Sequence, residues 1–172
     1  MLKNKKLFVI ISFLYSLILS SCTNNGYKVN VEKDRDYSEY QSYRLNSLLD
    51  FYNIDEEYYA IYLTSTSCPH CQEIKNHLLS YYDLDQIPFT LLYFDMKARG
   101  TEEGDLNRSF FMPPNEYSAI YNIDTMLKNN VSDLKDTYFC GTPSIYVVKN
   151  SSLNECYVGK NEVLTFIDSF IK

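Results

Sequence analysis

Two short apolar runs rich in β-forming residues predict the first strands of a buried sheet. One run spans Tyr58–Thr64 and the other Ile87–Phe94. Between them, the segment Gln72–Tyr82 has apolar residues spaced for one face of a helix, namely Ile74, Leu78 and Tyr81. This order predicts a βαβ unit with two parallel strands.

The C-terminal part of the chain has the pattern of two strands followed by a helix. Ser144–Lys149 and Glu155–Val158 are apolar runs separated by the polar turn 150–154, which predicts an antiparallel hairpin. Gly159 ends the hairpin, and Asn161 is a suitable N-cap for a last helix. Its apolar face consists of Val163, Leu164, Ile167, Phe170 and Ile171.

The remaining segments have weaker patterns. Residues from Tyr37 to Phe51 have apolar positions at helical spacing, which predicts an amphipathic helix before the first strand. Residues 95–115 are polar and contain glycine and proline, which predicts a loop, and residues 115–136 predict one or two helices. We therefore expect a helical and loop insertion at about 95–136 that mainly pads the surface, although it could instead cover a site.

The N-terminus has the layout of a bacterial export signal. Lys3, Lys5 and Lys6 precede an apolar run from 7 to 19, which is shorter than the about 20 residues of a membrane span. Leu19-Ser20-Ser21-Cys22 resembles the lipobox at which lipoprotein precursors are cleaved. We expect residues 1–21 to be removed, Cys22 to be acylated (as with palmitate), and residues 22–36 to be a tether. An ordinary signal peptide with a nearby cysteine is the alternative.

Composition and charge narrow the function classes. The chain has 172 residues, 45% of them hydrophobic, and a formal net charge of −6. One globular domain, at 37–172, is therefore expected. Without a basic stripe to neutralise phosphates, nucleic acid is an unsuitable partner. The lipidated chain would face the extracytoplasmic side of a bacterial cell membrane, where disulfides persist.

The clearest chemical motif is Cys68-Pro69-His70-Cys71, between a predicted strand and a predicted helix. A helix N-terminus favours the thiolate of the first cysteine, so Cys68 is the candidate nucleophile. Cys71 lies one turn away and can attack a mixed disulfide at Cys68. His70 can favour the Cys68 thiolate electrostatically. A structural disulfide or half of a zinc site would be the alternative, but no second ligand pair has the usual spacing, so we expect no metal and no other cofactor.

A second motif supports a resemblance. Gly141-Thr142-Pro143 precedes the predicted hairpin, and together with the Cys-x-x-Cys helix it resembles the thioredoxin superfamily from Tyr58 onward. The resemblance implies an α/β fold with a central mixed sheet, a cis bond before Pro143, and a substrate segment bound along Thr142 and Pro143. Cys-Pro-His-Cys is similar to the redox-active disulfide of DsbA-like oxidases.

The sequence departs from that family's pattern in three places. Ser67 stands where cytosolic thioredoxins usually have tryptophan, and Tyr62 stands where a buried acid often lies under the second cysteine. The stretch between Cys71 and Pro143 is also longer than in the minimal fold. Loss of the acid puts efficient proton removal from Cys71 in doubt, which matters most for a reductase.

Cys140 and Cys156 have two interpretations. The oxidising compartment would allow them to form a disulfide, but the predicted hairpin places Cys156 opposite about Tyr146, beyond Cys140. Otherwise Cys140 is a thiol at the rim of the site and Cys156 a small buried hydrophobic residue.

The leading hypothesis is a membrane-anchored protein thiol–disulfide oxidoreductase that acts on exported or cell-surface proteins, in the oxidase direction, with a membrane redox partner. One alternative is a lipoprotein reductase fed by a membrane electron donor. The other is a non-catalytic binding lipoprotein, such as an accessory to bacteriocin transport, that keeps the fold as a scaffold.

Overall fold

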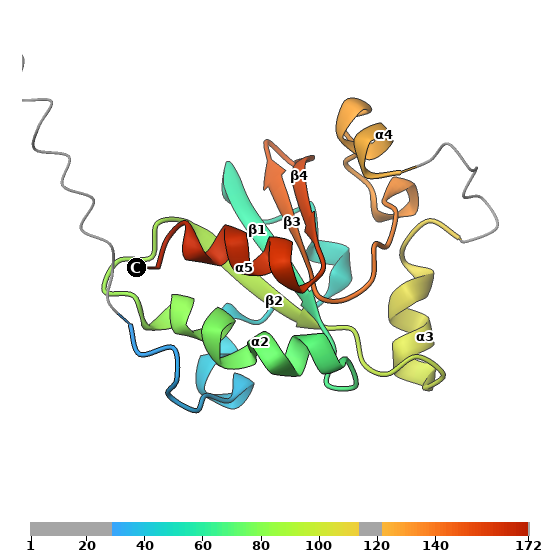
Figure 1. Cartoon of the computed structure of the whole chain (residues 1–172). Coiled ribbons are helices and arrows are strands. Elements are labelled where there is room, and N and C mark those ends of the chain that lie inside the picture. The colour runs from blue at the N-terminus through green and yellow to red at the C-terminus, as the bar shows by residue number, and fades with distance from the viewer. Residues whose placement is uncertain (1–28, 114–121, 172) are drawn as a thin grey trace, which may run out of the picture.

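The structure is a computed structural model and describes residues 29–113 and 122–171 (Figure 1). The predicted signal peptide, Cys22 and the first part of the tether lie outside the described residues. Among the helices that are described, none is long and apolar enough to cross a membrane.

The core is a four-stranded mixed sheet with the strand order β2-β1-β3-β4. The strands are β1 (Tyr58–Thr64), β2 (Thr90–Asp95), β3 (Ser144–Lys149) and β4 (Ser152–Val158). β1 is parallel to β2 and antiparallel to β3, and β3 is antiparallel to β4. With helix α2 (Pro69–Leu79) between β1 and β2, this topology confirms the predicted thioredoxin-like α/β fold.

One face of the sheet is covered as the sequence predicts. Helices α2 and α5 (Lys160–Asp168) lie together on this face (Figure 1). Ala60 and Tyr62 of β1 point into it and are fully buried, and Leu78 of α2 and Val163 and Ile167 of α5 are buried with them. The helix α5 begins two residues earlier than expected, because Gly159 is its N-cap and Asn161 already lies inside it.

The opposite face of the sheet is covered by the insertion together with residues 45–52. Phe111, Met126, Val131 and Leu134 are buried against it, together with Tyr59, Ile61 and Leu63 of β1. The described parts of the insertion, 95–113 and 122–136, therefore contribute to the core, and the expectation that the insertion mainly pads the surface was wrong for them. Its apolar residues are too widely spaced along the chain for a periodic pattern to show that they share one surface.

The insertion also contains a helix that the sequence analysis missed. Helix α3 (Glu102–Ser109) lies in the stretch predicted as a loop, and its buried residues are Gly104 and Asn107 rather than apolar side chains. The Thr101 hydroxyl caps it by accepting from the Gly104 N–H at 3.1 Å. A Cβ at Gly104 would lie 1.9 Å from the Ala98 carbonyl oxygen, so only glycine permits this close approach. Helix α4 (Ile123–Lys128) and the 3-10 turn η5 (Leu134–Asp136) agree with the prediction of one or two helices.

The predicted N-terminal amphipathic helix is wrong. The segment forms two 3-10 helices, η1 (Tyr37–Tyr43) and η2 (Leu48–Asp50), joined by extended backbone. The Leu45 N–H donates to the Tyr93 carbonyl at 2.9 Å, and Arg44 bridges to the same residue. Pairing with the free edge of β2 therefore replaces continued helix formation.

The strand boundaries differ from the sequence prediction by up to three residues. β2 begins at Thr90 rather than Ile87. β4 begins at Ser152, because the turn uses only Asn150 and Ser151, both with positive φ. A bulge between Val147 and Val148 then restores the predicted register of Tyr146 opposite Cys156.

Candidate active site

The Cys-x-x-Cys motif begins helix α2 immediately after the central strand β1. Cys68 is the N-cap residue, with extended backbone, and Pro69 occupies the first turn. The Cys68 Sγ accepts a hydrogen bond from the Cys71 N–H at 3.2 Å. The backbone amide of the second cysteine therefore stabilises negative charge on the sulfur of the first.

The segment before β3 closes the site from the other side. The Thr142–Pro143 bond is cis, as the resemblance implied. The Cys68 thiol lies 3.4 Å from the Thr142 carbonyl oxygen, to which it donates. The fold therefore brings the predicted catalytic cysteine and the predicted substrate-binding residue into contact across a long stretch of sequence.

The two cysteines differ in exposure. Cys71 is fully buried, whereas Cys68 is partly exposed. Burial, and then the hydrogen bond to Cys68, raise the pKa of Cys71 to about 11. At neutral pH Cys71 therefore remains a thiol, and Cys68 is the sulfur that a large substrate can reach.

His70 is exposed, and its ring contacts Glu73 rather than Cys68. Its Nδ1 lies 3.4 Å from a Glu73 carboxylate oxygen, and Lys160 of α5 lies 2.7 Å from the same oxygen. Within the described part of the chain, no hydrogen bond joins His70 to Cys68. Lys160, followed by His70, lowers the pKa of Glu73. Any influence of His70 on Cys68 therefore acts beside an ionised carboxylate.

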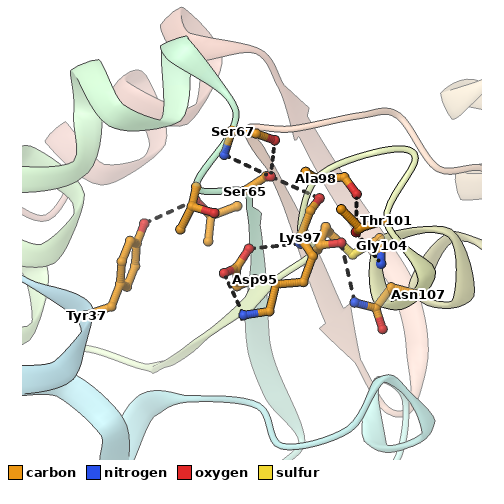
Figure 2. Close-up of polar contacts among 12 residues, drawn as sticks. Tyr37, Ser65, Ser67, Asp95, Lys97, Ala98, Thr101, Gly104 and Asn107 are labelled. Carbon is orange, nitrogen blue, oxygen red and sulfur yellow. Dashed lines mark hydrogen bonds and ion pairs between the residues drawn. The ribbon is translucent and has the colours of Figure 1, made fainter.

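A tyrosine takes the place of a buried acid beneath the motif. Tyr62 is fully buried, and burial holds its pKa well above the ordinary value. Its neighbour Tyr37 donates a hydrogen bond to the Thr64 hydroxyl at 3.2 Å (Figure 2). These phenols are neutral at physiological pH, so neither tyrosine can take a proton from Cys71.

A polar network ties the turn before the motif to the insertion, as Figure 2 shows. The Ser65 hydroxyl contacts the Ser67 hydroxyl at 3.0 Å and donates to the Lys97 carbonyl at 3.1 Å. The Lys97 ammonium pairs with Asp95 at 3.3 Å. The sequence analysis missed Lys97 and Asp95. The available signal was their position after β2, because adjacent parallel strands end at the same edge of a sheet.

The described residues, 29–113 and 122–171, contain no group of three His, Cys, Asp or Glu side chains arranged to hold a metal ion. The partly exposed Cys68 can form a mixed disulfide, and Cys71 is within reach to resolve it.

No protein-family model and no curated protein matches the sequence. Solved structures similar to this chain include mitochondrial thioredoxin 3 from Saccharomyces cerevisiae, at 15% identity, 76% coverage of this chain, 95% of that chain and a TM-score of 0.40. A putative oxidoreductase with a thioredoxin fold has 15% identity, coverages of 78% and 97%, and a TM-score of 0.41. A thioredoxin mutant from Halobacterium salinarum has 12% identity, covers 75% of this chain and 88% of its own, and has a TM-score of 0.38. The assignment of a thioredoxin-like fold rests on the strand order and helix placement described above.

Proposed function

We propose that this chain is a protein thiol–disulfide oxidoreductase that exchanges disulfides with exported proteins through Cys68 and Cys71. The observation that carries the proposal is the setting of Cys68. Its sulfur is partly exposed, accepts the Cys71 N–H and contacts the Thr142 carbonyl. A sulfur so placed can be attacked by a client thiolate while the client's backbone lies along Thr142.

In the oxidase direction the reaction has two exchanges. A client thiolate attacks Cys68 of the Cys68–Cys71 disulfide, and Cys71 leaves as a thiolate that takes up a proton. A second client thiolate then attacks the client sulfur of the mixed disulfide, and Cys68 leaves as a thiolate. The client loses two electrons to form its disulfide, and the dithiol gains them. A membrane redox partner would reoxidise the dithiol.

The environment of Cys71 affects the rate of exchange in both directions. A reductase must deprotonate Cys71 before it attacks the mixed disulfide, and an oxidase must release the same sulfur as a thiolate that takes up a proton. Burial keeps the pKa of this thiol at about 11, and Tyr62 below it is a neutral phenol, so both steps are poorly assisted. The oxidase direction therefore rests on the similarity of Cys68-Pro69-His70-Cys71 to DsbA-like oxidases.

The membrane attachment in this proposal rests on the sequence. Cys22 follows a signal-like segment and would hold the domain, through a lipid and the tether, at the extracytoplasmic surface. Exported and cell-surface proteins would pass the site there. Labelling with a radioactive fatty acid tests this attachment, and a Cys22→Ser chain that still took up label would exclude it.

The direction of electron flow is tested by equilibrating the full chain with glutathione buffers. We expect a reduction potential nearer the about −120 mV of strong oxidants than the about −270 mV of thioredoxin. A chain with Cys140→Ser and Cys156→Ser isolates the Cys68–Cys71 pair in this measurement. A value at the thioredoxin end would reject the oxidase direction, and the absence of a reversible dithiol would reject the whole activity.

A further inference from the structure

The other two cysteines in the described part of the chain meet on one face of the sheet. Cys156 in β4 pairs with Tyr146 in β3. Residues paired across antiparallel strands project to the same face. Tyr146 is fully buried on the face covered by the insertion, and Cys140 and Cys156 both pack against that cluster.

Tyr146 holds Cys140 at this place. Its hydroxyl accepts from the Cys140 N–H at 2.9 Å and donates to the Tyr138 carbonyl at 3.1 Å. The segment 138–140 is therefore fastened over the end of the Tyr146 ring, beside the strand that contains Cys156. The sequence argument against pairing assumed that Cys140 lies beyond the hairpin, whereas the chain folds back over it.

The Cys140 thiol donates a hydrogen bond to the Tyr138 carbonyl at 3.6 Å. The Cys156 thiol is near enough to lower the pKa of Cys140, and Cys140 raises the pKa of Cys156. Both residues are partly exposed. One member of the pair is thus favoured as a thiolate and the other as its proton donor, and a small reagent can reach both.

We propose that Cys140 and Cys156 form a second, reversible disulfide that fastens the segment before Pro143 to strand β4. The Cys140 thiolate attacks a low-molecular-weight disulfide, such as oxidised glutathione, and releases one thiolate. Cys156, as it loses its proton to solvent, attacks the Cys140 sulfur and releases the second thiolate. The protein dithiol loses two electrons and two protons, and the glutathione disulfide becomes two thiols.

The position of this disulfide gives it a structural consequence for the first pair. Cys140 lies two residues before Thr142, whose carbonyl contacts Cys68. The Ser144 hydroxyl donates to the Gly141 carbonyl at 2.7 Å and holds the intervening turn. Oxidation of the second pair therefore fixes the backbone on which a client of Cys68 would lie. The inference itself does not depend on the proposed exchange activity.

The second disulfide can be detected after trypsin cleavage, because trypsin places Cys140 and Cys156 in different peptides. The full chain is equilibrated in glutathione buffers, free thiols are alkylated, and the chain is cut with trypsin without reduction. Cys140 and Cys156 fall in peptides 136–149 and 150–160, so their disulfide joins two peptides. Cys68 and Cys71 share peptide 45–75, so theirs is internal. We expect the joined pair to appear as the buffer becomes oxidising and to disappear when it is reversed.

Variants separate this inference from the proposed function. The double variant Cys68→Ser and Cys71→Ser should keep the joined peptides although it lacks the first dithiol. Cys156→Ser should leave Cys140 open to alkylation or to a glutathione adduct. If Cys140 and Cys156 stay alkylated in buffers that oxidise Cys68 and Cys71, or join only after unfolding in urea, the second disulfide is excluded whatever the first pair does.

Discussion

The two cysteine pairs differ in how the fold creates them. Cys68 and Cys71 are one helical turn apart, and a backbone N–H of helix α2 stabilises the sulfur that reacts. Cys140 and Cys156 come from a loop and a strand, and a thiol stabilises the more acidic partner. The first pair joins a partly exposed with a buried residue, whereas both members of the second are partly exposed.

This difference indicates different tasks. A partly exposed sulfur with a buried partner suits exchange with large substrates. A protein substrate can contact only Cys68, and Cys71 is close enough to attack the mixed disulfide that forms there. A pair held over a core tyrosine suits a bridge that fastens two elements together. The comparison therefore predicts that substitutions affect the two pairs separately.

The largest effect is expected from Cys68→Ser. A serine hydroxyl accepts the Cys71 N–H but is not a nucleophile at neutral pH, so reduction of insulin by the full chain in dithiothreitol should fall to the uncatalysed rate. Thermal unfolding of the reduced protein should change little. Cys140→Ser is the matched control and should keep most of the rate. A Cys68→Ser chain that retained activity would move the chemistry to the second pair.

The alkylation rates of Cys71 and Cys140 should depend differently on pH, and this effect should be large. Only thiolates react with iodoacetamide, so alkylation of Cys71 in the Cys68→Ser chain should rise about tenfold per pH unit until its pKa of about 11. Alkylation of Cys140 should level off below the ordinary thiol pKa of 9.0, because Cys156 lowers its pKa. The rates are read from peptides 45–75 and 136–149.

The matched control for this comparison is Cys156→Ala, which removes the thiol donor and breaks any bridge. Cys140 should then remain reactive, with its plateau moved toward that of an ordinary exposed thiol. Equal pH profiles for Cys71 and Cys140 would remove the distinction between a buried resolving thiol and a thiol-stabilised one.

A smaller effect is expected from Tyr146→Phe. The change removes the hydroxyl and leaves the Cys140 N–H and Tyr138 carbonyl without this partner, which costs about 1–3 kcal/mol. Urea unfolding of the reduced chain measures the loss. The yield of joined peptides 136–149 and 150–160 should also fall, while the Cys68–Cys71 equilibrium stays unchanged. Tyr157→Phe, on the neighbouring strand and bonded to Glu155, is the control, with an effect within about 0.5 kcal/mol.

The sequence predicted the parts of this molecule that depend on local chemistry. The buried run of β1, the helix after Cys68 and the hairpin each show their own periodicity, and Cys68, Cys71, Thr142 and Pro143 lie where their motifs implied. These signals are local because a strand pleat, a helix turn or a proline acts within a few residues.

The parts that the sequence could not predict depend on contacts that periodicity does not report. Helix α3 buries a glycine and an asparagine, so it has no apolar stripe. The segment near Leu45 pairs with Tyr93, which lies far along the chain, instead of staying helical. Cys140 returns to the hairpin because Tyr146, six residues away, bonds its backbone.

The smallest effect concerns the charges beside the first pair. Glu73→Gln removes a carboxylate that contacts both Lys160 and His70, the residue beside Cys71 in the Cys-x-x-Cys motif. Because less negative charge opposes the Cys68 thiolate, the reduced form should be favoured severalfold in the glutathione equilibrium, less than the tenfold that corresponds to about 1.4 kcal/mol. Lys160→Met should shift it the opposite way. Neither change should alter the Cys140–Cys156 equilibrium, and a shift in both pairs would show that the two are coupled.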